Sequence, residues 1–390
     1  MTSQEAIQDK PKQKSRLHIT SAQNDARYVA LGRTLFLTQS PDAQKELKKA
    51  NKKKNGHPYV YPESTILSLA TIRCFCGLSF RVIQGLAIAA LGEDDAPGYR
   101  QIHRRMKSIK VSIKDNIITA RGKKSTLNMS IDGSGMSPNA RSEYIRYRHK
   151  TKHGFIRLVL VVDTDTREIL SFSITDDTVG EAPQFEDLTC AALENVGMGA
   201  LDVQDKKPVQ QSALQEADTN TRQKQSQTKV HANDKQESPQ SPSADNELLG
   251  QLNVIMRADG GFDSRKIFEV CKKLGITPYI RIKHNATTRS RGVSRDRTMA
   301  VLDQLGNGIT DPDKFAQLTK DERESNRKEW KKRVNYGKRW LVEIVISSFK
   351  RLFGDSVSAV TWENITQEIN LKVNIYNKML QVQRRAIAMA

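Results

Sequence analysis

The sequence predicts an α/β protein with a mixed sheet, preceded by an all-helical N-terminal part. Three observations predict this class. Apolar residues recur at helical spacing over 58–122, short β-branched and aliphatic runs follow over 123–202, and a strand-helix-strand pattern and then helices follow residue 249. Elements that change in this way along a chain form a sheet covered by helices. We therefore expect the sheet to lie in the centre of the chain.

Composition divides the chain into four regions. We expect a polar and basic, partly disordered tail over 1–57, a helical domain over 58–122, and one α/β domain formed by 123–202 together with 249–390. Residues 203–248 are rich in Gln, Ser, Lys, Asp and Asn and have few large apolar side chains. Such a segment cannot bury enough apolar surface to fold, so we expect a disordered polar insertion.

The charge of the chain points to an acidic partner. Lys and Arg number 63 against 44 Asp and Glu, which gives a net charge of +19. Proteins this basic commonly bind nucleic acid. No apolar run is long enough to span a membrane, and the four cysteines form no Cys-x-x-Cys pair, so neither a membrane span nor a structural zinc site is expected.

The N-terminal helices resemble a helix-turn-helix unit. Helical spacing and glycine stops predict helices over 63–76, 79–91 and 99–109. The third helix is basic and carries three cations on one face: Arg100, Arg104 and Lys107. Because a basic last helix after a turn is typical of helix-turn-helix proteins, we expect these residues to contact DNA. A small basic bundle that never touches DNA remains the alternative.

Strands and helices then alternate. The sequence predicts strands at 127–131, 156–162, 168–175, 252–256 and 277–282, helices at 183–196 and 267–274, an arginine-rich loop from 281, a polar linker through Trp330, and a closing helix from Thr361. This order is typical of one α/β domain with helices on its sheet.

Two aspartates occupy equivalent positions in this pattern. Asp132 and Asp259 each follow an apolar strand, and a glycine follows each of them, which leaves room for a bulky substrate backbone. Tips of neighbouring strands lie about 5 Å apart, so the two carboxylates can converge on one cation. We interpret other acids structurally: Asp163 and Asp165 as turn residues and Asp263 as a helix N-cap.

A third carboxylate lies on a basic helix near the C-terminus. Over 336–350 an α-helix would align four polar side chains on one face: Tyr336, Arg339, Glu343 and Lys350. Alone, this face is better explained as an ordinary solvated helix surface. With the two aspartates, Glu343 completes an oxygen-only set that favours Mg²⁺ or Mn²⁺. Two such ions can activate a water or a 3′-hydroxyl and stabilise the leaving oxygen of a phosphodiester.

These residues resemble the DDE transposases of prokaryotic insertion sequences. The resemblance lies in Ile131–Ser134, in Ala258–Ser264 and in the spacing Tyr-x2-Arg-x3-Glu-x6-Lys. It implies an RNase H-like fold in which Asp132, Asp259 and Glu343 hold two Mg²⁺ (or Mn²⁺) ions. It also implies that Tyr336, Arg339 and Lys350 hold the transposon-end DNA.

The resemblance implies hydrolysis at the transposon ends and then attack of the freed 3′-hydroxyl on target DNA. The expected partners are double-stranded DNA, as terminal inverted repeats and target, and a second copy of the chain, since two ends must be held together. We expect a protein of the prokaryotic cytoplasm at the nucleoid, with no membrane contact. Two alternatives remain: a catalytically inactive DNA-binding derivative, and a structure-selective nuclease on the same fold.

Overall fold

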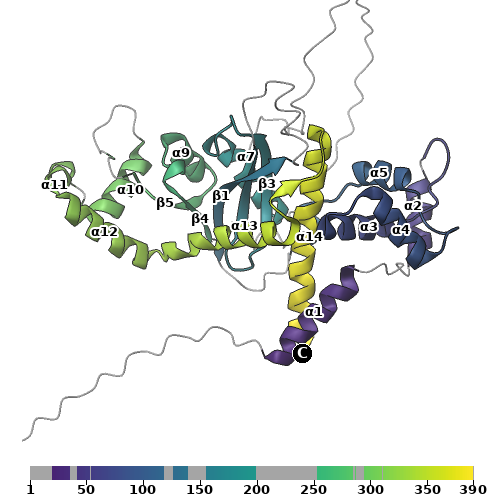
Figure 1. Ribbon diagram of the computed structural model, residues 1–390. Helices are drawn as coiled ribbons and strands as arrows, with labels where there is room; N and C mark the ends of the chain where they lie inside the picture. The colour runs from purple at the N-terminus through teal and green to yellow at the C-terminus, as the bar shows by residue number, and fades with distance from the viewer. Residues whose placement is uncertain are drawn as a thin grey trace, which may run out of the picture.

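Figure 1 shows the computed structural model of the chain. The part that the structure describes consists of residues 20–35, 42–52, 54–117, 126–138, 155–198, 253–283, 286, 294–309 and 311–389. Residues 1–19 of the predicted tail lie outside these ranges, and so does the whole predicted insertion over 203–248.

A mixed sheet forms the centre of the protein, as the sequence predicts. The strands have the order β3-β2-β1-β4-β5, in which β1–β2 and β2–β3 are antiparallel while β1–β4 and β4–β5 are parallel. A short β6 pairs with the far end of β1 in parallel. The strands run over β1 Thr126–Pro138, β2 Ile156–Asp163, β3 Ile169–Asp176, β4 Asn253–Ala258, β5 Ile276–Ile280 and β6 Ser356–Val357.

Different helices cover the two faces of the sheet. Ser130 of β1 donates a hydrogen bond to the Arg339 carbonyl (3.3 Å), just before α13 (Trp340–Phe353). On β3, Ser171 donates to the Leu188 carbonyl (2.7 Å) in α7 (Phe185–Asn195). The strand register aligns Ser171 with Ile131 through β2, and successive side chains of a strand point to opposite faces. The face of the even-numbered β1 residues therefore meets α13, and the other meets α7.

The predicted N-terminal helices are present with nearly the predicted bounds. They are α3 Glu63–Cys76, α4 Phe80–Leu91 and α5 Tyr99–Ser108, preceded by α1 Ser21–Leu35 and α2 Ala43–Asn51 and followed by the 3-10 helix η1 Ile113–Asn116. Gly77 ends α3 in the left-handed conformation (φ 64°). The Ser79 hydroxyl accepts a hydrogen bond from the Val82 amide and so caps α4.

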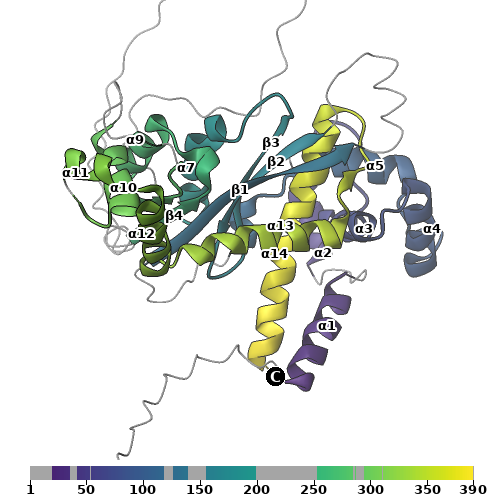
Figure 2. The same cartoon turned by 60° about the vertical axis from the view of Figure 1, so that its left-hand side comes forward.

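The closing helix α14 (Trp362–Met389) joins the N-terminal helices to the sheet. It packs against α1, α3 and η1 on one side and against α13, β3 and β6 on the other, as the two views in Figures 1 and 2 show. The Asn116 side chain donates to Asn374 Oδ1 (2.9 Å), and the rings of Phe75 and Phe353 lie 5.0 Å apart. One hydrophobic core therefore runs through both parts.

The predicted polar linker before residue 330 is wrong, because the chain there is helical. It forms α10 (Arg295–Gly306), α11 (Pro312–Gln317) and α12 (Lys320–Arg333). In α12 only Arg327 and Trp330 are buried, so the apolar period that marks a helix is missing. Among the described helices, none combines the length and the apolar character needed to cross a membrane.

Candidate active site

The strand register places Asp132 beside Asp259. In the parallel β1–β4 pair, Ser130 stands opposite Arg257, so two residues further along each chain the same offset aligns the two aspartates. Adjacent strands lie about 5 Å apart. Asp132 does not end its strand as predicted, because β1 continues to Pro138 in its pairing with β2. It lies instead where β4 ends and β1 continues.

Arg339 connects Asp132 with Glu343. Its Nη1 lies 3.3 Å from Asp132 Oδ2, and its Nη2 donates to Glu343 Oε1 at 2.5 Å. All three side chains are partly buried, with exposed fractions of 20% for Arg339, 18% for Asp132 and 39% for Glu343. The structure thus brings a strand carboxylate and a helix carboxylate to the same guanidinium. Arg339 and Glu343 lie side by side, as expected for two residues of the predicted polar face.

The α13 helix packs on the sheet through an apolar side, and this packing positions Glu343 on an adjacent face. Val342, Val345, Phe349 and Phe353 are buried. The helix contacts β1 and β2, and Figure 1 shows it crossing the sheet in front of β1. Glu343 stands in the first turn of α13, where the helix dipole favours a carboxylate.

Burial dominates the electrostatics of Asp132. The pKa of Asp132 is raised to about 6, because the effect of burial, with smaller contributions from the charges of Asp259 and Glu181, outweighs the Gly133 amide and Arg339, which lower it. The Gly133 amide donates to Asp132 Oδ1 (2.9 Å). Near this pKa, a proton and a cation compete for the same carboxylate.

Asp259 is held by its own loop. Its Oδ1 accepts a hydrogen bond from the Gly261 amide (2.7 Å), which caps the 3-10 helix η3 (Gly260–Phe262). This contact fixes the carboxylate just after β4, on the strand neighbouring Asp132. Asp259 therefore combines the place predicted for a metal ligand with a capping role.

Tyr336 does not lie on the exposed polar face that the sequence predicts. It is buried, with 7% of its surface exposed, and its hydroxyl donates to the Ala258 carbonyl (2.8 Å). The first turn, η4 (Tyr336–Arg339), is a 3-10 helix, which changes the phase of the predicted α-helix. Burial raises the Tyr336 pKa to about 12. The tyrosine thus anchors the residue before Asp259.

Gly133 makes room for a protein side chain and not for the predicted substrate backbone. A Cβ at this position would lie 2.2 Å from Glu181 Oε1. Arg157 holds Glu181 in place through an ion pair (3.1 Å). Glu181 is the acid that sequence reasoning missed. The sequence feature that could have indicated Glu181 is its position just beyond β3, in the segment that leads to α7.

Lys350 stands near the far end of β1. Its ammonium donates to the Gly135 carbonyl (2.6 Å), so it lies on the same side of the strand region as Glu343, two helical turns away. Its predicted contact with DNA phosphate stays a prediction. The three basic residues of α5, Arg100, Arg104 and Lys107, are exposed and belong to a different part of the molecule, beyond α14 (Figure 1).

The competing acids have structural roles. Asp163 Oδ1 accepts a hydrogen bond from the Asp165 amide (2.8 Å), which confirms the predicted turn. Asp263 is not the N-cap of α9 (Arg265–Lys273), because its carboxylate is bound by Arg297 at 2.6 and 2.9 Å and by the Lys283 amide at 3.0 Å. Asp263 thus ties the start of α10 to the end of β4.

The donor set fits a hard divalent cation in kind. Asp132, Asp259 and Glu343 offer oxygen atoms, which Mg²⁺ and Mn²⁺ prefer. In the described part of the chain, no three carboxylate, His or Cys side chains stand close enough together to hold a metal ion. Arg339 lies between Asp132 and Glu343. For both carboxylates to bind one ion, this guanidinium must move.

Comparison with known families covers both halves of the site. Two family models, each described as a Transposase DDE domain, match the chain, one over residues 32–139 and the other over 218–378. The first contains Asp132 and α5, and the second contains Asp259, Glu343 and Lys350. The second match begins inside the predicted insertion. No curated protein matches the chain. Over these two stretches, the chain is similar to DDE transposase domains, and this similarity suggests a transposase.

Proposed function

We propose that this protein is the transposase of an insertion sequence. It binds the terminal inverted repeats, hydrolyses a phosphodiester at each end and joins the freed 3′-hydroxyl to target DNA. The observation that supports this most strongly is the alignment of Asp132 with Asp259 in the β1–β4 register, with Glu343 brought to Asp132 through Arg339. The net charge of +19 fits a DNA substrate.

The proposed chemistry consists of two displacements at phosphorus. In the first, a water oxygen bonds to phosphorus while the bond to the 3′-oxygen breaks, which leaves a 3′-hydroxyl and a 5′-phosphate. In the second, that 3′-hydroxyl attacks a target phosphodiester and releases a target 3′-hydroxyl. Two divalent cations would supply Lewis acidity to the attacking and leaving oxygens. The role of Asp132, Asp259 and Glu343 is to hold them.

The basic residues around the carboxylates would position the DNA. The Arg339 guanidinium contacts Asp132, and on release it can form a bidentate contact with a phosphate. Lys350 supplies a point charge further along α13. Tyr336 would act indirectly, by fixing the Ala258 carbonyl and hence the start of the Asp259 loop. The exposed basic face of α5 would bind the inverted repeat.

Cleavage of cognate DNA by the full chain tests this proposal. With Mg²⁺, the protein should nick DNA that carries the ends of its own element, identified by inverted repeats beside the gene. Glu343→Gln should abolish nicking while the protein still binds these ends. Glu93→Gln, which neutralises an exposed acid far from the carboxylates, serves as the matched control. Retained nicking by Glu343→Gln would refute the assigned role of Glu343.

The same experiment separates the two alternatives. Binding to the ends without any metal-dependent nicking by the unmodified protein would identify an inactive DNA-binding derivative. Nicking that depends on DNA structure and not on the inverted repeat, with no joined product, would identify a nuclease. Joined products with target DNA would support the transposase.

A further inference from the structure

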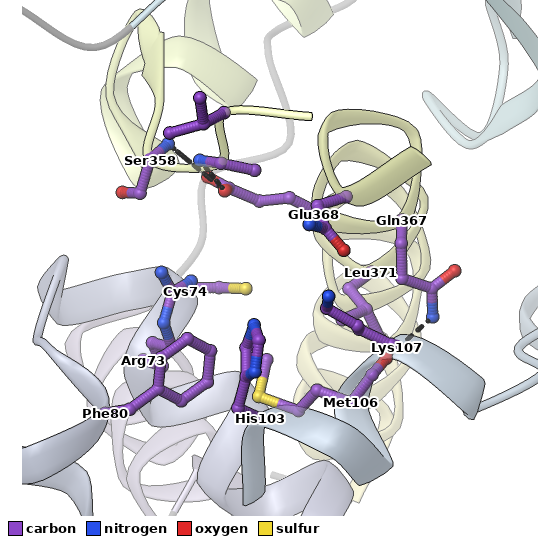
Figure 3. Close-up of a pocket in the computed structure, with 13 residues that line it drawn as sticks. Arg73, Cys74, Phe80, His103, Met106, Lys107, Ser358, Gln367, Glu368 and Leu371 are labelled. Atoms are coloured by element: carbon purple, nitrogen blue, oxygen red, sulfur yellow. Dashed lines mark hydrogen bonds between the residues drawn. The ribbon is translucent and has the colours of Figure 1, made fainter. Parts of the chain in front are cut away.

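A cavity of about 230 Å³ lies between the N-terminal helices and the start of α14. Figure 3 shows α3 and α5 forming one side of it, while α14 and the segment around Ser358 form the other. It is separate from the carboxylate site, because none of Asp132, Asp259, Glu343 or Arg339 lines it. Its wall combines cations, amides and apolar side chains.

Three basic side chains line this cavity. Arg73 comes from α3, and His103 and Lys107 come from α5. The Arg73 Nε is buried and has no hydrogen-bond partner in the part of the chain that the structure describes. A buried donor without an acceptor is costly, and an anion in the cavity would stabilise the guanidinium as a whole.

The acidic lining residue does not cancel this positive charge. Glu368 forms a buried ion pair with Lys372 (2.9 Å) and accepts hydrogen bonds from the Ser358 and Ala359 amides at 2.9–3.1 Å. Its charge is therefore compensated within the protein. The Cys74 thiol adds no negative charge, because burial raises its pKa to about 11. The net field in the cavity favours an anion.

The apolar part of the wall suits more than a bare anion. Phe80, Met106 and Leu371 line it. The Arg73 guanidinium lies over the Phe80 ring, 4.4 Å from the centroid, and the His103 ring meets Phe80 edge-on at 4.9 Å. Phe80 thus holds the Arg73 and His103 side chains in place beside an apolar surface. Such a wall can pack against the carbon atoms of a sugar or a base next to a phosphate.

The position of the cavity on α5 relates it to DNA. At 100° per residue, an arc of about 100° around the α5 axis contains His103 and Lys107 together with Arg100 and Arg104. We infer that this cavity is a binding site for a nucleotide phosphate of the DNA strand that runs along α5, held by Arg73, His103 and Lys107. This inference deepens the proposed function and rests on its DNA-binding part.

Such a ligand would connect α5 with α14. Met106 and Leu371 lie on opposite walls, and α14 continues from there to the sheet and α13. DNA bound at the cavity would therefore touch the helix that joins the N-terminal part to the part that carries Glu343. This contact would help to fix the distance between the bound repeat and the site of cleavage.

His103 offers a direct readout of binding. Burial lowers its pKa, and Lys107 and Arg73 lower it further. The groups that face it are these two cations and, from α14, Glu368 with its partner Lys372. An anion bound beside His103 would stabilise the imidazolium, so its pKa should rise on binding.

Two measurements on the full chain test the inference. The first compares DNA affinity after Lys107→Gln and after Lys110→Gln, because both lysines are exposed at the same end of α5 but only Lys107 lines the cavity. We expect a loss of about tenfold for Lys107→Gln, as for a hydrogen bond to a charged group, and of about twofold for Lys110→Gln. Ala359→Leu, a half-buried lining position, should narrow the cavity without changing charge and should also weaken binding.

The second measurement follows the His103 imidazole by NMR while a probe is added. The His103→Gln variant is used to assign the resonance. The probes are inorganic phosphate, a single-stranded oligonucleotide and a duplex, and the pKa of His103 should rise with at least one DNA probe. Equal effects of Lys107→Gln and Lys110→Gln, with no response of His103 to any probe, would overturn the inference. A response to inorganic phosphate alone would overturn its assignment to DNA and leave an anion site. A response to DNA without any nicking would support the inference while the proposed catalysis fails.

Discussion

Arg339 Nη1 lies 3.3 Å from Asp132 Oδ2, although 207 residues separate them in the chain. The same guanidinium binds Glu343. Arg339 thus supplies the positive charge that two neighbouring carboxylates need, which is also what a divalent cation would supply. Cation binding and the Arg339 bridge are therefore expected to compete.

Replacing Arg339 should strengthen cation binding in the absence of DNA. Arg339→Gln removes the bridging charge, so Mn²⁺ affinity measured by calorimetry should rise about fivefold, equivalent to about 1 kcal/mol. Nicking of DNA should fall, because the guanidinium is also the proposed phosphate contact. Lys338→Gln is the matched control, since Lys338 pairs with Asp165 and not with the site carboxylates. Equal Mn²⁺ affinities for the two variants would contradict the competition.

Removing the Tyr336 hydroxyl should cost stability and not DNA affinity. Tyr336→Phe deletes the hydrogen bond to the Ala258 carbonyl, which keeps a second donor in the Arg281 amide (3.2 Å). The free energy of unfolding should therefore fall by about 1 kcal/mol. Denaturant unfolding measures this, and DNA affinity should change less than about twofold because the side chain is buried. A large loss of affinity at unchanged stability would restore the direct contact with DNA that the sequence predicted.

The sequence predicts the fold where apolar periodicity and end signals agree. The bounds of α3 and α4 follow from Gly77 and Ser79, and β2 follows from an apolar run. The mixed sheet follows from the order of these elements. The α12 helix could not be predicted by periodicity, because its buried residues include the charged Arg327. The signal that could have found it is a capping box, Thr319 with Glu322.

The candidate site was predictable in its acids but not in its contacts. Asp132 and Asp259 are predicted because each follows an apolar run and precedes a glycine, and Glu343 is predicted from its helical spacing. The place of Tyr336 could not be derived, because a 3-10 turn shifts the helical phase. The approach of Glu181 to Gly133 is a tertiary contact between β1 and the segment after β3, and no local pattern encodes it.

A methyl group at Gly133 should displace Glu181. Gly133→Ala would place a Cβ 2.2 Å from Glu181 Oε1 and 2.4 Å from its Cδ, so the Glu181–Arg157 ion pair must shift. We expect a lower free energy of unfolding, with part of the loss restored in the double variant Gly133→Ala/Glu181→Ala. The coupling should be about 1–3 kcal/mol in a double-mutant cycle.

Gly85→Ala is the matched control for this substitution. Gly85 lies within α4, and a Cβ there meets nothing within 4 Å. It should leave stability unchanged or raise it by up to about 1 kcal/mol, because alanine is the better helix former. Additive effects of Gly133→Ala and Glu181→Ala would show that the two positions do not interact.

The stability of the metal-free protein should depend on pH through Asp132. Folding raises the pKa of this carboxyl from 3.8 to about 6, mainly by burial, so its contribution to stability is present below pH 3.8 and is lost as the pH rises through about 6. Asp132→Asn mimics the protonated form. The free energy of unfolding of this variant should therefore gain on that of the unmodified protein as the pH rises through this window.

Two further variants should move the upper end of this window in opposite directions. Glu181→Gln removes a neighbouring negative charge and should lower the folded-state pKa of Asp132, so the loss of stability would end at lower pH and be smaller. Arg339→Gln removes a positive charge and should raise that pKa, so the loss would extend to higher pH and be larger. Thermal unfolding across a pH series measures all three. A difference between Asp132→Asn and the unmodified protein that stays constant with pH would show that Asp132 does not titrate in this range.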